Sequence, residues 1–331
     1  METIIKRTDI CIINDSGLEI TLSTIGASIK EVKVLDKDGI KRLVTLAPIT
    51  EEEYLNNYHG KIVGRTAGRI ENAMFSIDGK TAYLDKNNFD IDNLHSGDSC
   101  FSYKTFNYGI IEEKEYTDII FTTKSFDGEG GYFGDVILLV TYRVFSYENK
   151  FKVIIEGIVS EKTLLNITNH VYWNLSGDLR EAIDNHCLYI NSSKYGVLNE
   201  RFICNQIESV NTYFDFRNCH KIGKYLNHDF VTQYTSGYDH PFVLDSKGMN
   251  DIACTLKSEL SGIELNVKTT YPCVVFYSDN LGGNLSNMPK KQMAVCLECQ
   301  YLPNGINMNI EECGICSTDK PYYNEIEYSF K

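Results

Sequence analysis

The segment Asp135-Val-Ile-Leu-Leu-Val-Thr-Tyr142, with Phe151-Lys-Val-Ile-Ile-Glu-Gly-Ile-Val159 after it, decides the fold. Both runs are rich in β-branched and hydrophobic residues that favour strands, and a turn signal at Glu148-Asn149 separates them. Further runs of this kind occur at residues 18–22, 29–34 and 118–123. Turn signals follow at Asp38-Gly39, Asp78-Gly79 and Asp127-Gly128. The pattern predicts strand after strand, joined by short turns.

Helical periodicity is rare in this chain. The clearest case begins at Thr50, where Thr50-Glu51-Glu52-Glu53 forms a capping box, and it ends before Gly60. Residues 74–84 predict a hairpin around Asp78-Gly79, and no alternation of strands and helices, fixed repeat or linker is visible. We therefore expect residues 1–331 to form a single all-β domain, a large antiparallel sandwich or barrel-like structure with few short helices.

The charge balance bears on the class of partner. The chain has 45 acidic and 32 basic residues and a formal net charge of −13. Nucleic acids and anionic membranes select basic patches, so we expect neither as a partner; a neutral small molecule fits best. The N-terminal residues lack a basic-then-apolar leader, and no apolar run approaches the roughly 20 residues that span a bilayer. A cytoplasmic location is expected, while the sequence says nothing about an oligomeric partner.

Eleven cysteines are scattered along the chain and are expected to be reduced thiols. Cys296-x-x-Cys299 followed by Cys313-x-x-Cys316 has the spacing of a zinc ribbon. However, the first pair lies in a predicted strand, where residues three apart point to opposite faces and cannot grip one ion. We expect no metal, although a zinc-bearing β protein remains an alternative.

The strand Ala-Val-Cys-Leu-Glu-Cys-Gln at residues 294–300 carries a carboxylate among apolar residues. Alternation places Glu298 on one face and Leu297 and Cys299 on the other. A charge on such a strand is costly unless it is paired or lines a cavity. Glu298 is therefore a partner in a buried salt bridge, a charge at a sheet edge, or a general base with a tuned pKa.

Four other segments place polar residues where a plain strand or turn does not need them. Taken singly, each is typical of a loop, a turn or a buried structural histidine. They are residues 64–70 with Arg65 and Arg69, residues 93–97 with His95, residues 166–175 with His170, and residues 237–242 with Asp239.

In this order on an all-β chain, these segments resemble the aldose 1-epimerase (galactose mutarotase) family. The resemblance rests on Ala-Gly-Arg-Ile at 67–70, Asn-Leu-His-x-Gly at 93–97, Thr-Asn-His-x-Tyr-aromatic-Asn-Leu at 168–175, Gly-Tyr-Asp-His-Pro-Phe at 237–242 and Leu-Glu-x-Gln at 297–300. Glu-Gly-Gly-Tyr-Phe-Gly at 129–134 is similar to a further family turn, with one extra glycine. The resemblance covers essentially the whole chain and implies the large β-supersandwich of galactose mutarotases.

The resemblance also implies an activity, the interconversion of the α and β anomers of aldohexoses such as galactose and glucose. By resemblance, Glu298 is the base and His170 the acid, and no cofactor or metal is needed. Arg69, His95 and Asp239 are implied to bind the sugar hydroxyls. We expect the Glu298 carboxylate to keep His170 protonated. Tyr172 or Trp173 is a candidate for packing on the apolar face of the sugar.

Three departures accompany the resemblance. Gly68 stands where many members have asparagine, Trp173 where phenylalanine is common, and Cys299 where proline is common. Gly68 puts one substrate hydrogen bond in doubt. Two further alternatives are a non-catalytic sugar-binding protein on the same fold and a hexose-phosphate 1-epimerase, which would need cationic residues beyond Arg65 and Arg69.

Overall fold

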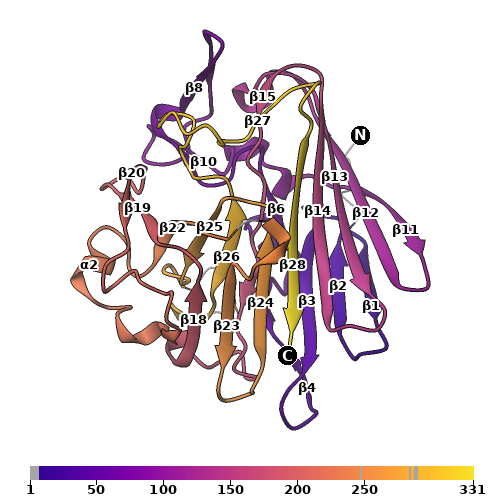
Figure 1. Cartoon of the computed structure of the whole chain (residues 1–331). Helices are drawn as coiled ribbons and strands as arrows, with labels where there is room; N and C mark the ends of the chain where they lie inside the picture. The colour runs from indigo at the N-terminus through magenta and orange to yellow at the C-terminus, as the bar shows by residue number, and fades with distance from the viewer. Residues whose placement is uncertain (1–6, 247, 283–284, 287–289) are drawn as a thin grey trace.

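The computed structural model describes residues 7–246, 248–282, 285–286 and 290–331. Strands dominate this part of the chain, and its two α-helices are short: α1 (Glu51–Leu55) and α2 (Asp229–Thr232). Figure 1 shows a layered structure built from antiparallel strands. The prediction of an all-β antiparallel sandwich is confirmed.

The largest layer is a sheet of nine strands, with the predicted hairpin β13–β14 near its centre. The register pairs Tyr142 with Val153 across this hairpin. In spatial order the strands are β11 (Asn107–Glu112), β12 (Tyr116–Ser125), β13 (Val136–Phe145), β14 (Lys150–Val159), β28 (Tyr322–Phe330), β24 (Glu264–Thr269), β23 (Cys254–Ser258), β18 (His186–Ile190) and β21 (His220–Lys221).

Two smaller sheets lie behind the nine-stranded sheet in the view of Figure 1. One has four strands: β1 (Asp9–Ile13), β2 (Glu19–Ser23), β3 (Ser28–Leu35) and β4 (Lys41–Leu43). The other has five, in the order β20 (Cys204–Ser209), β19 (Lys194–Leu198), β22 (Asp239–Val243), β25 (Cys273–Tyr277) and β26 (Cys296–Gln300). One hydrophobic core joins all three sheets, with Leu22, Val140 and Phe276 among its buried members.

Short two-stranded ladders connect the sheets. They are β5 (Thr45–Leu46) with β17 (Tyr172–Trp173), β6 (Ile62–Val63) with β16 (Thr168–Asn169), β7 (Arg69–Ile70) with β10 (Asn93–Leu94), β8 (Met74–Ile77) with β9 (Lys80–Tyr83), and β15 (Thr163–Leu164) with β27 (Ile315–Cys316). Single 3₁₀ turns complete the structure: η1 (Glu71–Ala73), η2 (Gly97–Ser99), η3 (Phe101–Tyr103), η4 (Glu129–Gly131), η5 (Ile183–Asn185), η6 (Ile222–Lys224) and η7 (Gly248–Asn250).

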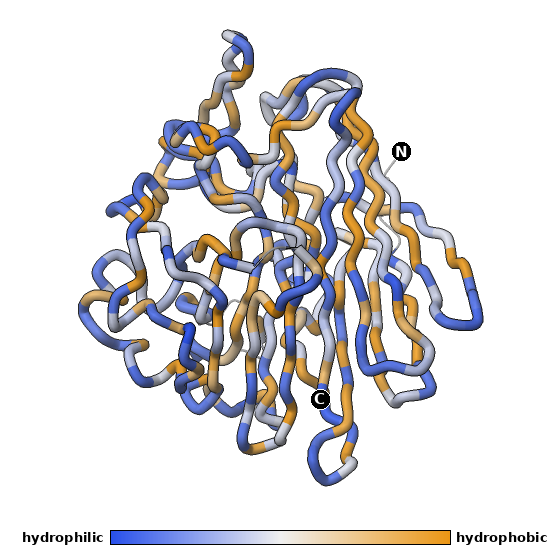
Figure 2. Tube along the Cα trace, viewed as in Figure 1, coloured by the Kyte–Doolittle hydropathy of each residue, from blue (hydrophilic) through white to orange (hydrophobic). Residues whose placement is uncertain are grey.

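Local sequence accounts for these elements. Hydrophobic and polar residues alternate along the strands in Figure 2, and on β14 every second side chain is buried. The β8–β9 hairpin confirms the turn predicted at Asp78-Gly79, where Gly79 adopts a φ of +80°. The capping box of α1 is confirmed too, because Thr50 Oγ1 accepts from Glu53 N–H at 3.2 Å and Glu53 Oε2 from Thr50 N–H at 3.2 Å. The helix is shorter than predicted, since it ends at Leu55.

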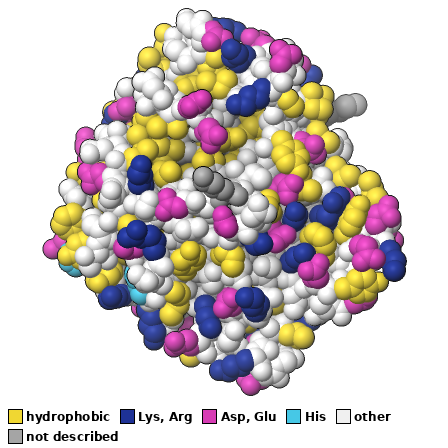
Figure 3. All heavy atoms as spheres, viewed as in Figure 1, with side chains coloured by type: hydrophobic (Ala, Val, Ile, Leu, Met, Phe, Trp, Pro, Cys, Tyr) yellow, Lys and Arg dark blue, Asp and Glu magenta, His cyan; other side chains and the backbone are white. Residues whose placement is uncertain are grey.

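Charged side chains of both signs are interspersed on the face seen in Figure 3. In the nine-stranded sheet, opposite charges on neighbouring strands form ion pairs. Arg143 Nη2 lies 2.7 Å from Asp118 Oδ2, and Lys152 Nζ lies 3.0 Å from Glu325 Oε2. None of the helices within the described ranges has the length and apolar character needed to cross a membrane.

Candidate active site

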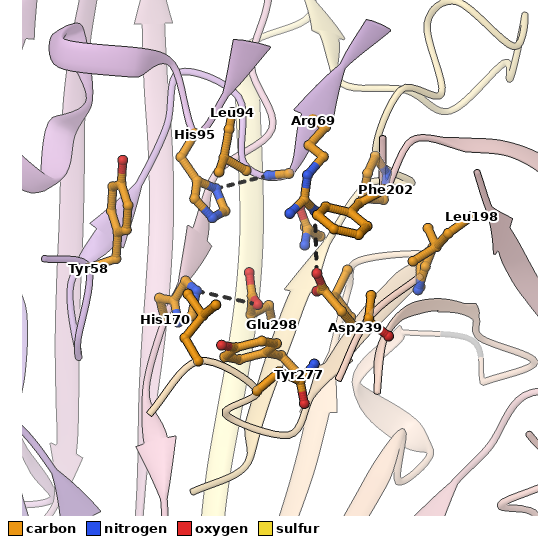
Figure 4. A pocket seen from close by; sticks show the side chains of 18 of the residues that line it. Tyr58, Arg69, Leu94, His95, His170, Leu198, Phe202, Asp239, Tyr277 and Glu298 are labelled. Carbon is orange, nitrogen blue, oxygen red and sulfur yellow. Dashed lines mark hydrogen bonds and ion pairs between the residues drawn. The ribbon is translucent and has the colours of Figure 1, made fainter. Parts of the chain in front are cut away.

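A cavity of about 530 Å³ opens on the face of the five-stranded sheet that points away from the common core. Side chains from β7, β22, β25 and β26 and from the segments after β10 and β16 line it (Figure 4). The five residues singled out from the sequence all face this cavity: Arg69, His95, His170, Asp239 and Glu298. Chain segments more than 200 residues apart in sequence therefore meet at one place.

Strand register explains how the sheet presents its carboxylates. Asp239 on β22 is paired with Tyr277 on β25, and Val275 on β25 is paired with Glu298 on β26. Residues two apart on one strand share a face, so Asp239, Tyr277 and Glu298 all project into the cavity. Leu297, on the other face of β26, packs in the common core. The alternation expected for residues 294–300 is present.

His170 reaches Glu298 from the end of β16. Backbone bonds from His170 N–H to Lys61 C=O at 2.9 Å and from Gly60 N–H to His170 C=O at 2.7 Å fix its main chain. The imidazole Nε2 lies 3.5 Å from Glu298 Oε1, and both side chains are almost fully buried. The two groups are close enough for one bound molecule to contact both.

Burial sets the protonation of this pair. It raises the pKa of Glu298 to about 8; the nearby Asp239 carboxylate acts in the same direction and Arg69 opposes it. Burial lowers the pKa of His170 to about 4. Burial therefore opposes the expectation that Glu298 keeps His170 protonated, because desolvation disfavours the imidazolium. Burial of both groups favours their neutral forms, in which the pair holds its one shared proton on Glu298.

Arg69 and Asp239 form a second pair in the cavity. Arg69 Nη1 lies 3.4 Å from Asp239 Oδ2, and both side chains are mostly buried. Burial raises the pKa of Asp239, and the guanidinium opposes this effect. Arg69 Nε has no hydrogen-bond partner within the described part of the chain. The pair offers both donors and acceptors to a ligand.

His95 is held in a single tautomer by the backbone. The ring Nδ1 of His95 accepts a hydrogen bond from the backbone N–H of Gly68 at 3.1 Å. The backbone N–H of His95 donates to Gly68 C=O at 3.0 Å. Burial lowers the pKa of His95 well below its ordinary value, and the neighbouring His170 and Arg69 act in the same direction. The ring is therefore neutral with its proton on Nε2, which makes it a hydrogen-bond donor.

Gly68 has a steric reason to lack a side chain. Its φ is +71°, and a Cβ atom at this position would lie 2.8 Å from Pro303 Cβ and 2.9 Å from Pro303 Cγ. The proline ring occupies the space that an asparagine side chain would need. Gly68 and Pro303 both line the cavity, so position 68 itself offers no side-chain amide; the carboxamide of Gln300, whose Oε1 is 3.6 Å from that Cβ position, lines the same part of the wall.

The two aromatic candidates for contact with the sugar, Tyr172 and Trp173, lie on opposite sides of β17. Tyr172 lines the cavity, and its ring is stacked on that of His170 with centroids 5.1 Å apart and planes 12° apart. Trp173 lies on the opposite side of its strand, fully buried in the common core, with its ring centroid 5.2 Å from that of Tyr328. Trp173 as a sugar platform is therefore wrong, because neighbouring residues on a strand face opposite ways.

The cavity also contains residues that the sequence did not single out. Gln300 and Tyr277 lie on the cavity-facing side of their strands; the sequence alternation places Gln300 on the same face as Glu298 but assigned it no role. Tyr58, His59 and Phe202 come from irregular segments without periodicity, so the sequence gives no signal for them. His59 is stacked on Tyr172 with centroids 3.7 Å apart.

Arg65 has a structural role outside the cavity. It is 1% exposed, so a solvated surface loop is the wrong interpretation of its segment. Its guanidinium donates to Ser125 Oγ at 2.9 Å, to Phe133 C=O at 2.8 Å and to Phe126 C=O at 2.8 Å. These bonds fasten the turn at residues 126–133.

The zinc-ribbon alternative lacks a ligand cluster. Cys296 packs with Leu46 and Tyr172, whereas Cys299 packs in the common core on the other face of β26. No group of three or more histidine, cysteine, aspartate or glutamate side chains that could hold a metal ion occurs in the ranges that the structure describes.

Comparison with known proteins gives a consistent picture. Residues 8–329 match a family model described as aldose 1-epimerase. The chain is 30% identical over 303 residues to the aldose 1-epimerase of Escherichia coli (strain K12), with 89% of this chain and 86% of that protein covered. It is 31% identical over 299 residues to the galactose mutarotase of Homo sapiens, with coverage of 88% and 84%. A solved structure of an aldose epimerase homologue from C. elegans superimposes with a TM-score of 0.88 at 27% identity, covering 98% of this chain and 99% of that one.

Proposed function

This chain belongs to the aldose 1-epimerase family of isomerases, and on that premise we propose that it interconverts the α and β anomers of aldohexoses such as galactose and glucose. The observation that carries the proposal is the buried Glu298–His170 pair, 3.5 Å apart in a cavity with room for a hexose. A matched acid and base is needed for ring opening and is not needed for binding alone. A non-catalytic sugar-binding protein is therefore the weaker alternative.

In the proposed mechanism, Glu298 and His170 exchange two protons with the sugar. Glu298 takes the proton of the C1 hydroxyl while His170 donates one to the ring oxygen, and the C1–O5 bond breaks to give the open-chain aldehyde. Rotation about C1–C2 presents the other face of the aldehyde. The ring oxygen then returns its proton to His170 as it attacks C1, and Glu298 returns its proton to the C1 oxygen.

The resting pair has the total charge that this mechanism requires. The pair has two forms with the same total charge: neutral Glu298 beside neutral His170, and the Glu298 carboxylate beside the His170 imidazolium. Transfer of one proton between the two side chains converts one form into the other. The neutral arrangement is also the one reached when the ring has opened, so burial favours the open-chain state of the enzyme. A sugar hydroxyl that donates to the carboxylate shifts the pair toward the form that starts the reaction.

Arg69, His95 and Asp239 are proposed to bind the remaining hydroxyls. Asp239 accepts from hydroxyl groups, His95 donates through Nε2, and Arg69 donates through its free N–H groups. The arginine charge is already matched by Asp239, which weakens the hexose-phosphate alternative because a phosphate needs unmatched cations. A neutral monosaccharide and a cytoplasmic location remain predictions.

Polarimetry on freshly dissolved α-D-galactose and α-D-glucose tests the proposal, with chelator present and no added metal. We expect acceleration over buffer. Glu298→Gln and His170→Asn should each lower turnover by at least ~10²-fold, because each removes one proton-transfer group. Glu113→Gln, on an exposed glutamate, is the matched control and should keep full activity. Absence of acceleration by the wild type, or near wild-type turnover of Glu298→Gln, overturns the proposal.

A further inference from the structure

The ring of Phe202 stands over the cavity arginine. Phe202 lies at the tip of the β19–β20 hairpin, in the segment between Leu198 and Cys204, and lines the cavity. Its ring centroid is 5.1 Å from the guanidinium carbon of Arg69, as the close-up in Figure 4 illustrates. At this distance an arginine is attracted to an aromatic face.

Arg69 has few other contacts that fix its plane. Its side chain makes one polar contact, at 3.4 Å to Asp239, and its Nε is buried without a partner among the residues described. A single long contact leaves a guanidinium free to turn about its last bonds. The face of Phe202, 5.1 Å from the guanidinium carbon, is a further contact that limits this rotation.

The backbone of Phe202 is held in an unusual conformation. Its φ is +61°, in the left-handed region that bulky residues rarely adopt. A tight turn maintains it: Phe202 N–H donates to Asn199 C=O at 2.9 Å, and Asn199 Oδ1 accepts from Arg201 N–H at 2.9 Å and Ile203 N–H at 3.1 Å. Strained residues of this kind concentrate at functional sites.

The neighbouring Arg201 ties this hairpin tip to the ladder that carries Arg69. Arg201 Nη1 lies 2.7 Å from Asp92 Oδ1 and Nη2 lies 3.0 Å from Glu71 Oε1. Glu71 directly follows β7, and the fully buried Asp92 directly precedes β10. Ring and guanidinium therefore sit on two pieces of chain that are fastened together.

We propose that Phe202 is a positioning residue for sugar binding, which holds the Arg69 guanidinium in the plane that meets the substrate hydroxyls. The inference rests on the proposed function of the cavity and adds a residue outside the motifs that define it. Phe202 is not a proton-transfer group. Its effect is expected on binding, in the ground state and the transition state alike.

The first test compares Phe202→Leu with Phe202→Tyr, measuring KM and kcat for galactose. Leucine keeps an apolar side chain and removes the aromatic face, so KM should rise about threefold to tenfold with kcat within about twofold. Tyrosine keeps the face and should behave like the wild type. Phe230→Leu, which removes an exposed ring on α2, is the matched control. A fall in kcat with unchanged KM indicates a merely structural role and overturns the inference.

A double-mutant cycle with Arg69→Ala shows whether the ring acts through the arginine. Phe202→Leu should lower kcat/KM in the wild-type background and change it by less than about twofold when Arg69 is already alanine. An equal loss in both backgrounds means that the ring contacts the sugar directly or supports the fold, and overturns the inference. Calorimetric titration of galactose into the same four proteins gives the cycle in binding affinity. It separates failure of this inference from failure of the proposed catalysis.

Discussion

At the scale of single residues, the site depends on burial acting in opposite directions on an acid and a base. The same low-polarity surroundings raise the pKa of Glu298 and lower the pKa of His170. Each group alone would be an ordinary buried side chain. Together they hold one proton over a wide pH range, which suits a reaction that moves one proton in and one out at each step.

A bell-shaped pH profile of kcat/KM follows from these pKa directions. Below about pH 4 both groups of the free enzyme are protonated and no base remains; above about pH 8 both are deprotonated and no acid remains. Mutarotation rates from pH 3 to 10, corrected for the buffer reaction, check this. In the residual activity of the variants, Glu298→Gln should remove the acid limb, because no base is left to be protonated, and His170→Asn should remove the alkaline limb, because no acid is left to be deprotonated. A rate independent of pH from 5 to 10 contradicts acid–base catalysis by this pair.

The sequence predicted site residues that lie on regular strands or in recognisable motifs, and it missed those in irregular segments. Glu298 was found because it places a charge in an otherwise apolar strand, where an unpaired charge is costly. Phe202 and His59 lie in irregular segments, where no period relates one residue to the next. The downward shift of the pKa of His170 was not predicted, because it depends on how deeply the folded cavity buries the imidazole.

At the scale of elements, Gly68 shows how two segments constrain each other. It directly precedes β7, and its missing side chain leaves room for the ring of Pro303 from the segment after β26. The two positions form one steric unit. Replacing either residue alone therefore changes the packing of both segments.

Gly68→Asn should destabilise the protein by about 1–3 kcal/mol more than Gly79→Asn, because of overpacking. Both glycines have a φ near +75°, at +71° and +80°, but a Cβ at Gly79 meets nothing within 4 Å. The cost of placing a side chain at a positive φ is therefore similar in the two variants. The difference between their free energies of unfolding in urea measures the cost of the steric clash with Pro303. Adding Pro303→Ala should restore part of the loss for Gly68→Asn. Equal loss at both glycines would show that backbone conformation alone excludes a side chain at Gly68.

Elements were predicted well where the pattern is local and less well where it is not. Turn chemistry at Asp78-Gly79 and the capping residues of α1 act within a few residues, and both were located correctly. The helix α1 ends earlier than expected, at Leu55, where the Asn56 side-chain amide donates to Glu52 C=O at 3.0 Å and the Asn57 side-chain amide donates to Glu53 C=O. The pairing of nine strands in one sheet could not be predicted, since strands distant in the chain become neighbours.

At the scale of the whole molecule, one core supports three sheets and places the cavity on the far side of one of them. Trp173 belongs to that core, fully buried against Tyr328 and Phe330. The only tryptophan of the chain therefore reports on the core rather than on the cavity.

Tryptophan emission, excited at the red edge of indole absorption, should not change on addition of saturating galactose. Calorimetry under the same conditions checks that galactose binds, and we expect that binding to leave the surroundings of Trp173 unchanged. Guanidinium chloride should shift the emission to longer wavelength in step with loss of the core. A saturable response to galactose at constant fold would mean that sugar binding deforms the core, contrary to this expectation.

The position of β28 also determines when the molecule can form during synthesis. This strand lies between β14 and β24, yet every other strand of the nine-stranded sheet precedes it in the chain. Until residues 322–330 leave the ribosome, the facing edges of β14 and β24 have no partner, and open strand edges recruit other chains. All the proposed catalytic and binding residues have been translated by then. A nascent chain that lacks residues 322–330 therefore contains every proposed site residue and still exposes two unpaired strand edges in its largest sheet.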